Sequence, residues 1–444
     1  MRLLVVLWIL WPASNLFPQE QSQDKPKFEV DLSEFQKEVD KLATKSYSLG
    51  GFVEFQPTLL GIDRGSAVYH ARFFDDPQDS VFDQYNFRLR LEGSYKKDWF
   101  SMFFKTDTLV RNDFQGWDED TKLFEAYASA KPNENLIFEA GKKVMKWGKG
   151  YAWNPVSFID RPKNPEDPEE ALEGSTVATA DYIRSFDGPL KTLTLTTALI
   201  PVYKYVNAKF GTPRRTNFAS KVYLLLYDTD LDFMVLTGES RTTRYGFDFS
   251  KNLTTNLEIH GEFAVVNNLD KMAINARGQP IQSQSDATSQ LVGLRYLTEK
   301  ETTYFLEYYR NGGGYSRAEI KNFFSFVDDS YRTFLNSGND SGLVRARKLL
   351  DGPYGMPSPA RHYLYFRASQ KEPFDILYFT PAVTSIMNLS DASLTIIPEL
   401  SYSPMTNLEL RFRTPILLGK NGTEYGEKQN DYRIELRLRY HFGL

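Results

Sequence analysis

Arginine side chains occupy alternate positions in three separate segments of the sequence. In the last of these segments, Arg433, Arg437 and Arg439 alternate with apolar and aromatic residues up to Phe442. Arginine stays charged at any physiological pH, and its planar set of donors fits a carboxylate or a phosphate. The charged positions of the three segments are Arg88, Arg90, Glu92, Glu409, Arg411, Arg413, Arg433, Glu435, Arg437 and Arg439.

The alternation itself predicts strands with one apolar face and one charged face. In residues 430–442 the apolar face begins at Tyr432 and ends at Tyr440 and Phe442, so aromatic residues stand at both ends. A soluble sandwich turns its apolar face inward, whereas a membrane barrel turns it outward to lipid and carries aromatic girdles at both interfaces. The pattern therefore favours a barrel whose arginines face the lumen.

An arginine-lined lumen favours the passage of anions. The alternative is that arginine and glutamate pair across neighbouring strands and only brace the wall. Seven arginines stand against three glutamates in these segments, so the charge balance favours an anion-selective lumen.

The rest of the chain repeats the strand pattern. The composition agrees, because 26 Tyr and 33 Phe are typical of aromatic girdles. Short turns alternate with longer loops, which is the arrangement of an outer-membrane barrel with both termini in the periplasm. We predict an all-β fold, a transmembrane antiparallel β-barrel of about 18 strands with long extracellular loops, and 16 strands also fit. The strands are expected near residues 47–60, 85–95, 98–109, 121–130, 135–145, 175–186, 190–201, 216–227, 231–239, 242–250, 254–267, 288–298, 301–310, 361–369, 373–388, 391–403, 406–417 and 430–442.

The loop at residues 146–174 is long, rich in proline and too apolar to lie freely in water. One interpretation is that it folds into the barrel and constricts the pore, where its rings would stack on sugar faces. The other is that the rings cap the outer rim. The aromatic residues concerned are Trp147, Tyr151, Trp153 and Phe158.

A cluster of carboxylates follows in the same loop. Calcium binding is one interpretation, since carboxylate oxygens are its usual ligands. A solvated acidic loop is the commoner meaning of such a cluster, and we favour it. The residues are Glu166, Asp167, Glu169, Glu170 and Glu173.

The other long loop, residues 311–360, contains a predicted helix. Ser316 and Glu319 have capping-box spacing, and Gly338 is a suitable stop. Apolar residues between them fall on one helical face, which must cover something apolar. The helix therefore lids the barrel mouth or lies on its rim.

The N-terminus has the pattern of an export signal. Residues 1–18 combine a short positive start with an apolar run that is too short to span a bilayer, and they predict a signal peptide. A buried N-terminal strand or helix is the alternative. Residues 19–46 then form a periplasmic leader with a short amphipathic helix over 31–43, and residues 47–444 form the barrel.

The sequence offers little support for an enzyme or a cofactor. Cysteine is absent, which excludes disulfides, thiolate metal sites and cysteine nucleophiles. The four histidines show neither metal spacing nor a nucleophile setting, and the glycine run at 312–314 lacks the residues of a phosphate loop. A net charge of -4 does not indicate a nucleic-acid partner. We expect no cofactor, no metal and no catalytic residue.

The passage from Glu139 to Pro155 resembles the alginate-export porin family and related porin-like barrels of unknown function. There a strand containing Gly141 runs into Trp147–Gly148 and then Asn154–Pro155. The resemblance implies passive passage of a solute, often an anionic polysaccharide, past folded-in loops. The chain departs from such barrels at its end, where Gly443 and Leu444 follow the aromatic Phe442.

These observations predict a passive outer-membrane channel of a Gram-negative cell for a hydrophilic, anionic solute such as an acidic polysaccharide. Its expected partners are outer-membrane lipids, lipopolysaccharide and the barrel assembly machinery. One alternative is a transporter for lipids or other hydrophobic molecules, with a plugged lumen and a lateral opening. Another is a non-transporting structural or enzymatic barrel.

Overall fold

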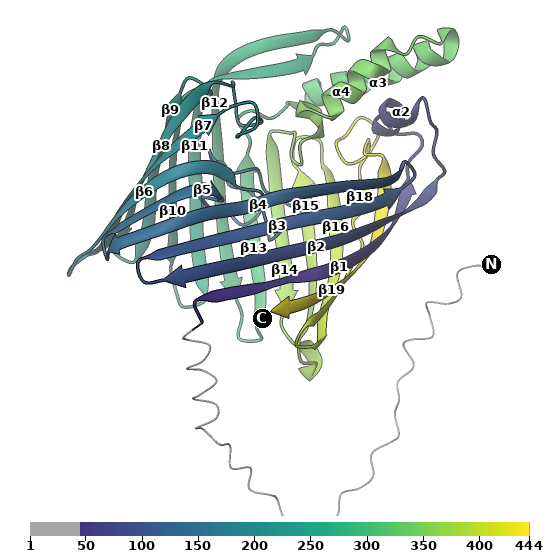
Figure 1. The fold of residues 1–444 in the computed structure, drawn as a ribbon. Coiled ribbons are helices and arrows are strands. Elements are labelled where there is room, and N and C mark those ends of the chain that lie inside the picture. The colour runs from purple at the N-terminus through teal and green to yellow at the C-terminus, as the bar shows by residue number, and fades with distance from the viewer. Residues whose placement is uncertain (1–44, 444) are drawn as a thin grey trace, which may run out of the picture. The chain divides into compact units, whose positions relative to one another are not determined.

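The computed structural model describes residues 45–443, which form a closed antiparallel β-barrel (Figure 1). The predicted signal peptide and leader helix lie outside the described residues. The strands are β1 (Tyr47–Ile62), β2 (Val81–Lys97), β3 (Phe100–Asp113), β4 (Gly116–Asn133), β5 (Leu136–Lys143), β6 (Ser175–Ser185), β7 (Leu190–Val202), β8 (Arg215–Leu226), β9 (Thr229–Gly238), β10 (Arg244–Asn252), β11 (Leu257–Ile274), β12 (Pro280–Leu297), β13 (Thr302–Arg310), β14 (His362–Gln370), β15 (Phe379–Asn388), β16 (Ser393–Met405), β17 (Leu408–Arg413), β18 (Ile416–Leu418) and β19 (Asn430–Gly443).

Each strand pairs with the next, and β1 closes the ring against β19, from Gly50 opposite Gly443 to Ile62 opposite Asn430. The segments β17 and β18 form one barrel strand, because both pair with β16 and β19. They are separated at Pro415, which has no N–H to continue the ladder. The barrel therefore has 18 strands, as the sequence predicted.

The apolar side chains of the strands face outward. Leu436 and Phe87 are 41% and 43% exposed, whereas Arg413 and Glu435 on the other face are 4% and 9% exposed. A soluble protein would bury the first pair and expose the second. The inversion is the pattern of a barrel that faces lipid and keeps its polar groups in the lumen. No helix within residues 45–443 is long and apolar enough to cross a membrane.

Short turns join the strands at the end of the barrel where β1 begins, which we call the turn end; the other end is the loop end. Three helices gather at the loop end, at the top of Figure 1. These are α2 (Ala67–Phe73), α3 (Arg317–Ser337) and α4 (Ser341–Leu350), followed by a single turn η1 (Pro353–Gly355), and we call the group the cap. A second single turn, η2 (Pro373–Asp375), lies at the turn end between β14 and β15.

The predicted helix of the second long loop is α3. Its capping box is complete, with Ser316 and Glu319 each accepting from the other's backbone, and it ends at Gly338 in the left-handed conformation. The sequence did not indicate α2 or α4, because helices of seven and ten residues show too few turns for a periodic pattern.

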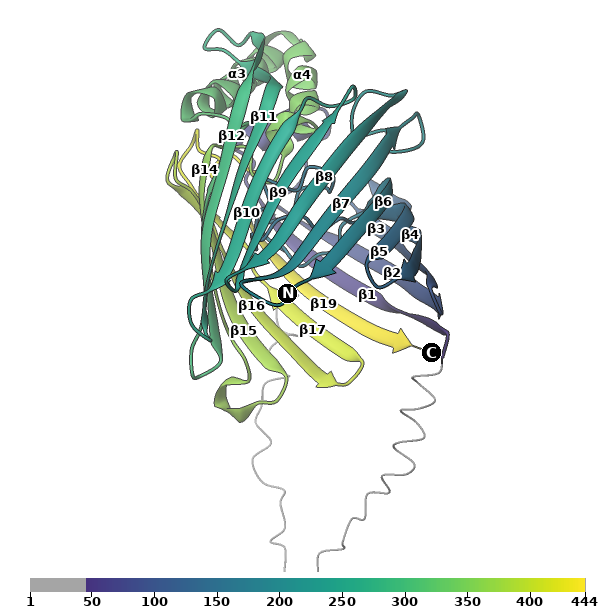
Figure 2. The same ribbon diagram turned by 90° about the vertical axis from the view of Figure 1, so that its left-hand side faces the viewer.

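The strand boundaries differ most from those expected in the β11–β12 hairpin and at the start of β15. The hairpin of β11 and β12 continues to Ile274 and Pro280, beyond the expected ends at 267 and 288, and is visible at the loop end in Figure 2. The extension of β12 is mostly polar, and the apolar residues Met272, Ala273 and Ile274 of β11 are consecutive, so neither shows apolar alternation. β15 begins at Phe379 rather than at 373, because η2 and Tyr378, which has φ 59°, interrupt the extended backbone.

Candidate functional site

The segment between β5 and β6, residues 144–174, lies inside the barrel, and we call it the lumen loop. Its contacts reach strands that are far apart in the ring. The backbone N–H of Lys149 donates to Glu262 of β11 at 2.7 Å, and Asp167 accepts from Arg411 of β17 at 2.7 Å. The loop therefore crosses the lumen from one wall to the other.

The strands that the first half of the lumen loop contacts carry buried carboxylates. Glu262 accepts the backbone N–H groups of Gly150 and Val156 as well as that of Lys149, and also the side chain of Asn154. A carboxylate that accepts several amide donors in a buried site forms strong, charge-assisted hydrogen bonds. Glu262 thus fixes the backbone of the first half of the loop.

Glu307 of β13 provides a second fixing point. It accepts the backbone N–H of Tyr151 and that of Ala152, the latter at 2.9 Å, while His260 Nε2 lies 2.9 Å away. On β9, Asp232 binds the loop's Lys149 at 3.0 Å. With Asp248 of β10, which is fully buried, these residues form what we call the carboxylate wall: Asp232, Asp248, Glu262 and Glu307.

The aromatic residues of the lumen loop are buried or partly buried, and two of them pack against β13 of the barrel. Trp147 and Phe158 are 3% and 2% exposed. The ring of Trp153 stacks on Tyr309 with centroids 5.1 Å apart, and that of Tyr151 stacks on Phe305 at 4.1 Å. These four residues therefore anchor the loop, and none of them lines the cavity described next.

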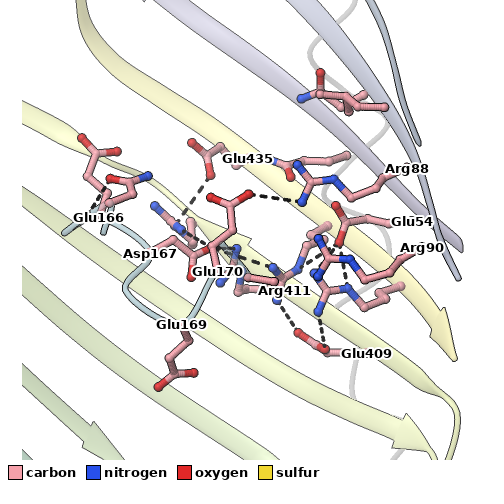
Figure 3. A pocket seen from close by; sticks show the side chains of 18 of the residues that line it. Glu54, Arg88, Arg90, Glu166, Asp167, Glu169, Glu170, Glu409, Arg411 and Glu435 are labelled. Atoms are coloured by element: carbon pink, nitrogen blue, oxygen red, sulfur yellow. Dashed lines mark hydrogen bonds and ion pairs between the residues drawn. The ribbon is translucent and has the colours of Figure 1, made fainter. Parts of the chain in front are cut away.

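A cavity of about 380 Å³ separates the second half of the lumen loop from the opposite wall. Most of its lining is charged (Figure 3). Eight arginines come from β2, β3, β17 and β19, and we call them the arginine wall: Arg88, Arg90, Arg111, Arg411, Arg413, Arg433, Arg437 and Arg439. The strands add three glutamates, Glu54, Glu409 and Glu435, and the loop adds four carboxylates, Glu166, Asp167, Glu169 and Glu170.

Three of the loop carboxylates bind arginines directly. Asp167 lies 2.7 Å from Arg411 and 3.5 Å from Arg413. Glu166 binds Arg433, and Glu170 lies 3.2 Å from Arg88. Glu169 points away from the arginines in Figure 3, and its carboxylate accepts from the hydroxyl of Tyr151 at 2.9 Å.

The arginines of this contact keep Glu166 and Asp167 of the loop ionised. Burial raises the pKa of Asp167, but the guanidinium groups of Arg411 and Arg413 outweigh it and hold the pKa below its usual range. For Glu166, burial is likewise outweighed, by Arg433 and Arg413, so its pKa is also lowered. Glu166 and Asp167 are therefore fixed negative charges at neutral pH.

The arginines also bind carboxylates of the barrel strands. Arg437 donates to Glu409 at 2.5 Å, Arg439 to Glu54 at 2.8 Å, and Arg90 to Asp107 at 2.9 Å. Cross-strand bracing is thus present together with the cavity. The strands give the lining eight arginines and three glutamates, and Asp107 and Glu399 also bind these arginines. The strand carboxylates are still fewer than the arginines, so the lumen loop contributes to the charge balance.

Nine of the ten charged residues singled out in the sequence line this one cavity. The exception is Glu92, which lies on the same face of β2 but is exposed and sits 3.7 Å from Lys105. Sequence reasoning missed the partners of the arginines. The favoured interpretation of the loop carboxylates as a solvated cluster is wrong, because they bind arginines, and no group of metal-ligating residues was found in residues 45–443.

Glu173, the last of that cluster, lies outside the cavity and binds Lys142 at 2.6 Å and Arg161 at 2.6 Å. The sequence carried one signal for these partners of the arginines, which was the sign of the charge. Four acids lie within five positions of a loop, in a barrel that has an arginine-rich face.

No protein-family model matches the sequence, and no curated protein matches it. Solved structures are similar in fold. OccK5 (OpdH) of Pseudomonas aeruginosa is 10% identical over 89% of this chain and 98% of its own, with a TM-score of 0.50. OccK11 (OpdR) of the same organism is 12% identical over 89% and 96%, with a TM-score of 0.48. A Rhodopseudomonas blastica porin is 10% identical over 89% and 100%, with a TM-score of 0.43.

Proposed function

We propose that this protein is a passive channel of the Gram-negative outer membrane for hydrophilic solutes that carry carboxylates. One observation carries the proposal: three carboxylates of a loop, Glu166, Asp167 and Glu170, bind arginines of the wall in addition to the carboxylates of its own strands. When the second half of the lumen loop moves aside, the eight arginines keep only five strand carboxylates as partners, Glu54, Asp107, Glu399, Glu409 and Glu435. A solute carboxylate then takes the place of Asp167 or Glu170 on the same donors.

The fold supports the same proposal. The barrels that it resembles are outer-membrane porins and not enzymes, and the proposed function needs no chemical step. The outward apolar face fits a barrel inserted by the assembly machinery among outer-membrane lipids and lipopolysaccharide. In this proposal the residues that set selectivity are the arginine wall with Glu409 and Glu435, and the lumen loop is the constriction.

An acidic polysaccharide, the solute implied by the alginate-export resemblance, is the finer part of the proposal. The aromatic rings expected to stack on sugars do not support it, since Trp147 and Phe158 are buried against the wall. Support comes instead from the row of guanidinium groups, which offers several binding positions to a chain of carboxylates. Short organic anions fit the same row.

One observation favours a second candidate, a transporter for hydrophobic molecules. β4 pairs with β5 only from Ala126 to Asn133, so its first half, Gly116–Glu125, has a regular partner on one side only within the described chain. A cavity of about 810 Å³ lies beside it and includes Leu123 and Phe210 in its lining. The acidic run from Asp118 to Asp120 at that edge disfavours an apolar solute.

Single-channel recording of the refolded full chain under a salt gradient tests the proposal. Discrete conductance steps with an anion-selective reversal potential are expected, and oligomers of an acidic sugar added to one side should reduce the current. A folded barrel that shows no conductance would contradict the channel and favour the second candidate.

A further inference from the structure

The cap encloses a small cavity that the proposed channel does not use. Its volume is about 180 Å³, and it lies between α2, α3, α4, η1 and the segment that precedes β19. The apolar part of its lining consists of Val68, Ile320, Phe323, Phe324, Leu350 and Tyr354. Most of these side chains are nearly fully buried, so the walls of the cavity are well packed.

Five polar side chains also line the cavity: Arg72, Glu424, Lys428, Gln429 and Asn430. Three of them have an unused hydrogen-bonding atom each. These atoms are Glu424 Oε1, Gln429 Oε1 and Asn430 Nδ2, and each is buried with no hydrogen-bond partner in residues 45–443. Glu424 is 2% exposed, and its other oxygen accepts from Tyr363 at 2.7 Å and from Asn388 at 2.9 Å. A buried polar atom without a partner costs about 1–3 kcal/mol, so such atoms usually meet water or a ligand.

The orientation of Glu424 is therefore fixed while one of its oxygens is left free. Tyr363 and Asn388 come from β14 and β15, and the backbone N–H of Glu424 donates to Asp391 at 2.8 Å. Burial raises the pKa of Glu424 to about 7, against the opposing effect of Lys428. A carboxylate held rigidly at the edge of an apolar cavity is a specific acceptor for one donor group.

We propose that the cap cavity is a binding site for a small apolar molecule of one or two fused rings that carries an N–H or O–H donor. The ring would pack on Phe323 and Tyr354, which already stack with centroids 4.1 Å apart, and its donor would meet Glu424 Oε1. A cavity of ~150 Å³ is known to hold a benzene ring, so the size fits. A purely apolar ligand would leave all three polar atoms unpartnered.

The site is connected to the arginine wall. Lys428 lines the cap cavity and acts electrostatically on Glu424, and it acts in the same way on Glu166 of the lumen loop. Asn430 begins β19, which carries Arg433 three residues later. A molecule bound in the cap cavity thus contacts Lys428 and Asn430, in the segment that connects the loop end of the barrel to the arginine wall.

The test is ligand-observed fluorine NMR of the refolded full chain in micelles with 5-fluoroindole. The isosteric 5-fluoroindene, which lacks the donor, serves as the second probe. The wild-type protein should bind fluoroindole about tenfold more tightly than fluoroindene, as one additional buried hydrogen bond predicts. The substitution Val68→Phe fills the cavity from α2 and should abolish specific binding of both probes.

Val344→Phe is the matched control, because Val344 lies on α4 with 39% exposure and does not line the cavity. It should bind like the wild type, which also shows that an added ring leaves the cap folded. Equal binding of fluoroindole to the wild type and to Val68→Phe would mean that the probe enters only the micelle, and it would overturn the proposal. Equal affinity for the two probes would overturn the role of Glu424.

Discussion

The carboxylate wall and the arginine wall hold the two halves of the same loop in opposite ways. The carboxylate wall accepts from backbone N–H groups, such as those of Gly150 and Ala152, which the loop cannot withdraw without losing its conformation. The arginine wall donates to side chains, such as those of Asp167 and Glu170, which rotate freely once released. The first contact is an anchor, and the second is exchangeable.

The two contacts also differ in what lies between the lumen loop and the barrel strands. Beside the carboxylate wall the rings of Phe158 and Trp153 fill the space, whereas beside the arginine wall a cavity of about 380 Å³ remains. Salt and water reach the second contact more easily, and accessible ion pairs are weaker than buried ones. A solute that carries its own carboxylates therefore competes with the loop at the arginine wall alone.

The largest effect is expected from removing the anchor. Glu262→Ala leaves three backbone N–H groups of the lumen loop without their acceptor, which should cost about 3 kcal/mol or more in the free energy of unfolding. The loop should leave the lumen, and the single-channel conductance should rise several-fold. Unchanged conductance with reduced thermal stability would show that Glu307, Asp232 and the arginine contacts hold the loop without Glu262.

The next largest effect is expected from removing the loop's charge without moving the loop. The double substitution Asp167→Asn and Glu170→Gln keeps the side-chain sizes and removes two of the four loop carboxylates at the cavity. The reversal potential should shift toward anions, with a loss of about 1–2 kcal/mol in stability.

Asp329→Asn is the control for that double variant, because Asp329 forms an exposed pair with Arg332 on α3, outside the arginine cavity. It should leave the reversal potential unchanged. A shift of equal size in the control would show that the selectivity comes from the total charge and not from the cavity.

A smaller effect is expected from acid. The pKa values of Glu166 and Asp167 are lowered from ordinary values of 4.5 and 3.8, so their ion pairs contribute fully above those values. The contribution is lost only as the pH falls through the lowered values. Anion selectivity should stay constant from neutral pH down to 4.5 and increase below 3.8. An increase between neutral pH and 4.5 would contradict the assignment of these two groups.

The smallest effect is expected from an aromatic residue of the anchor. Trp153→Phe keeps a ring on Tyr309 but loses the bond from Nε1 to the Ser358 hydroxyl. The free energy of unfolding should fall by about 1 kcal/mol, measured by thermal denaturation, while conductance and selectivity stay the same. A change in selectivity would place Trp153 in the solute path.

The sequence predicted the barrel closely, because one face of each strand must meet lipid and the other must not. It also singled out seven of the eight arginines that line the cavity, since alternate positions on neighbouring strands point to the same side, but it did not single out Arg111. The sign of the loop's charge suited the arginines, but the sequence does not fix where the loop lies, so the pairing of Asp167 with Arg411 needed the structure. Glu262 and Glu307 were missed for a similar reason, since each is a lone acid whose partners are backbone groups of a distant loop.

The most direct test of the central claim uses the absence of cysteine from the chain. Ala171 lines the arginine cavity from the loop side, and Ala171→Cys places a single thiol there. Single-channel currents are recorded while methanethiosulfonate reagents of opposite charge are added. A cavity on the solute path predicts that a sulfonate reagent reduces the anion current and that an ammonium reagent increases it. A thiol that does not react, or currents that are the same after both reagents, would contradict the claim that solutes pass between the lumen loop and the arginine wall.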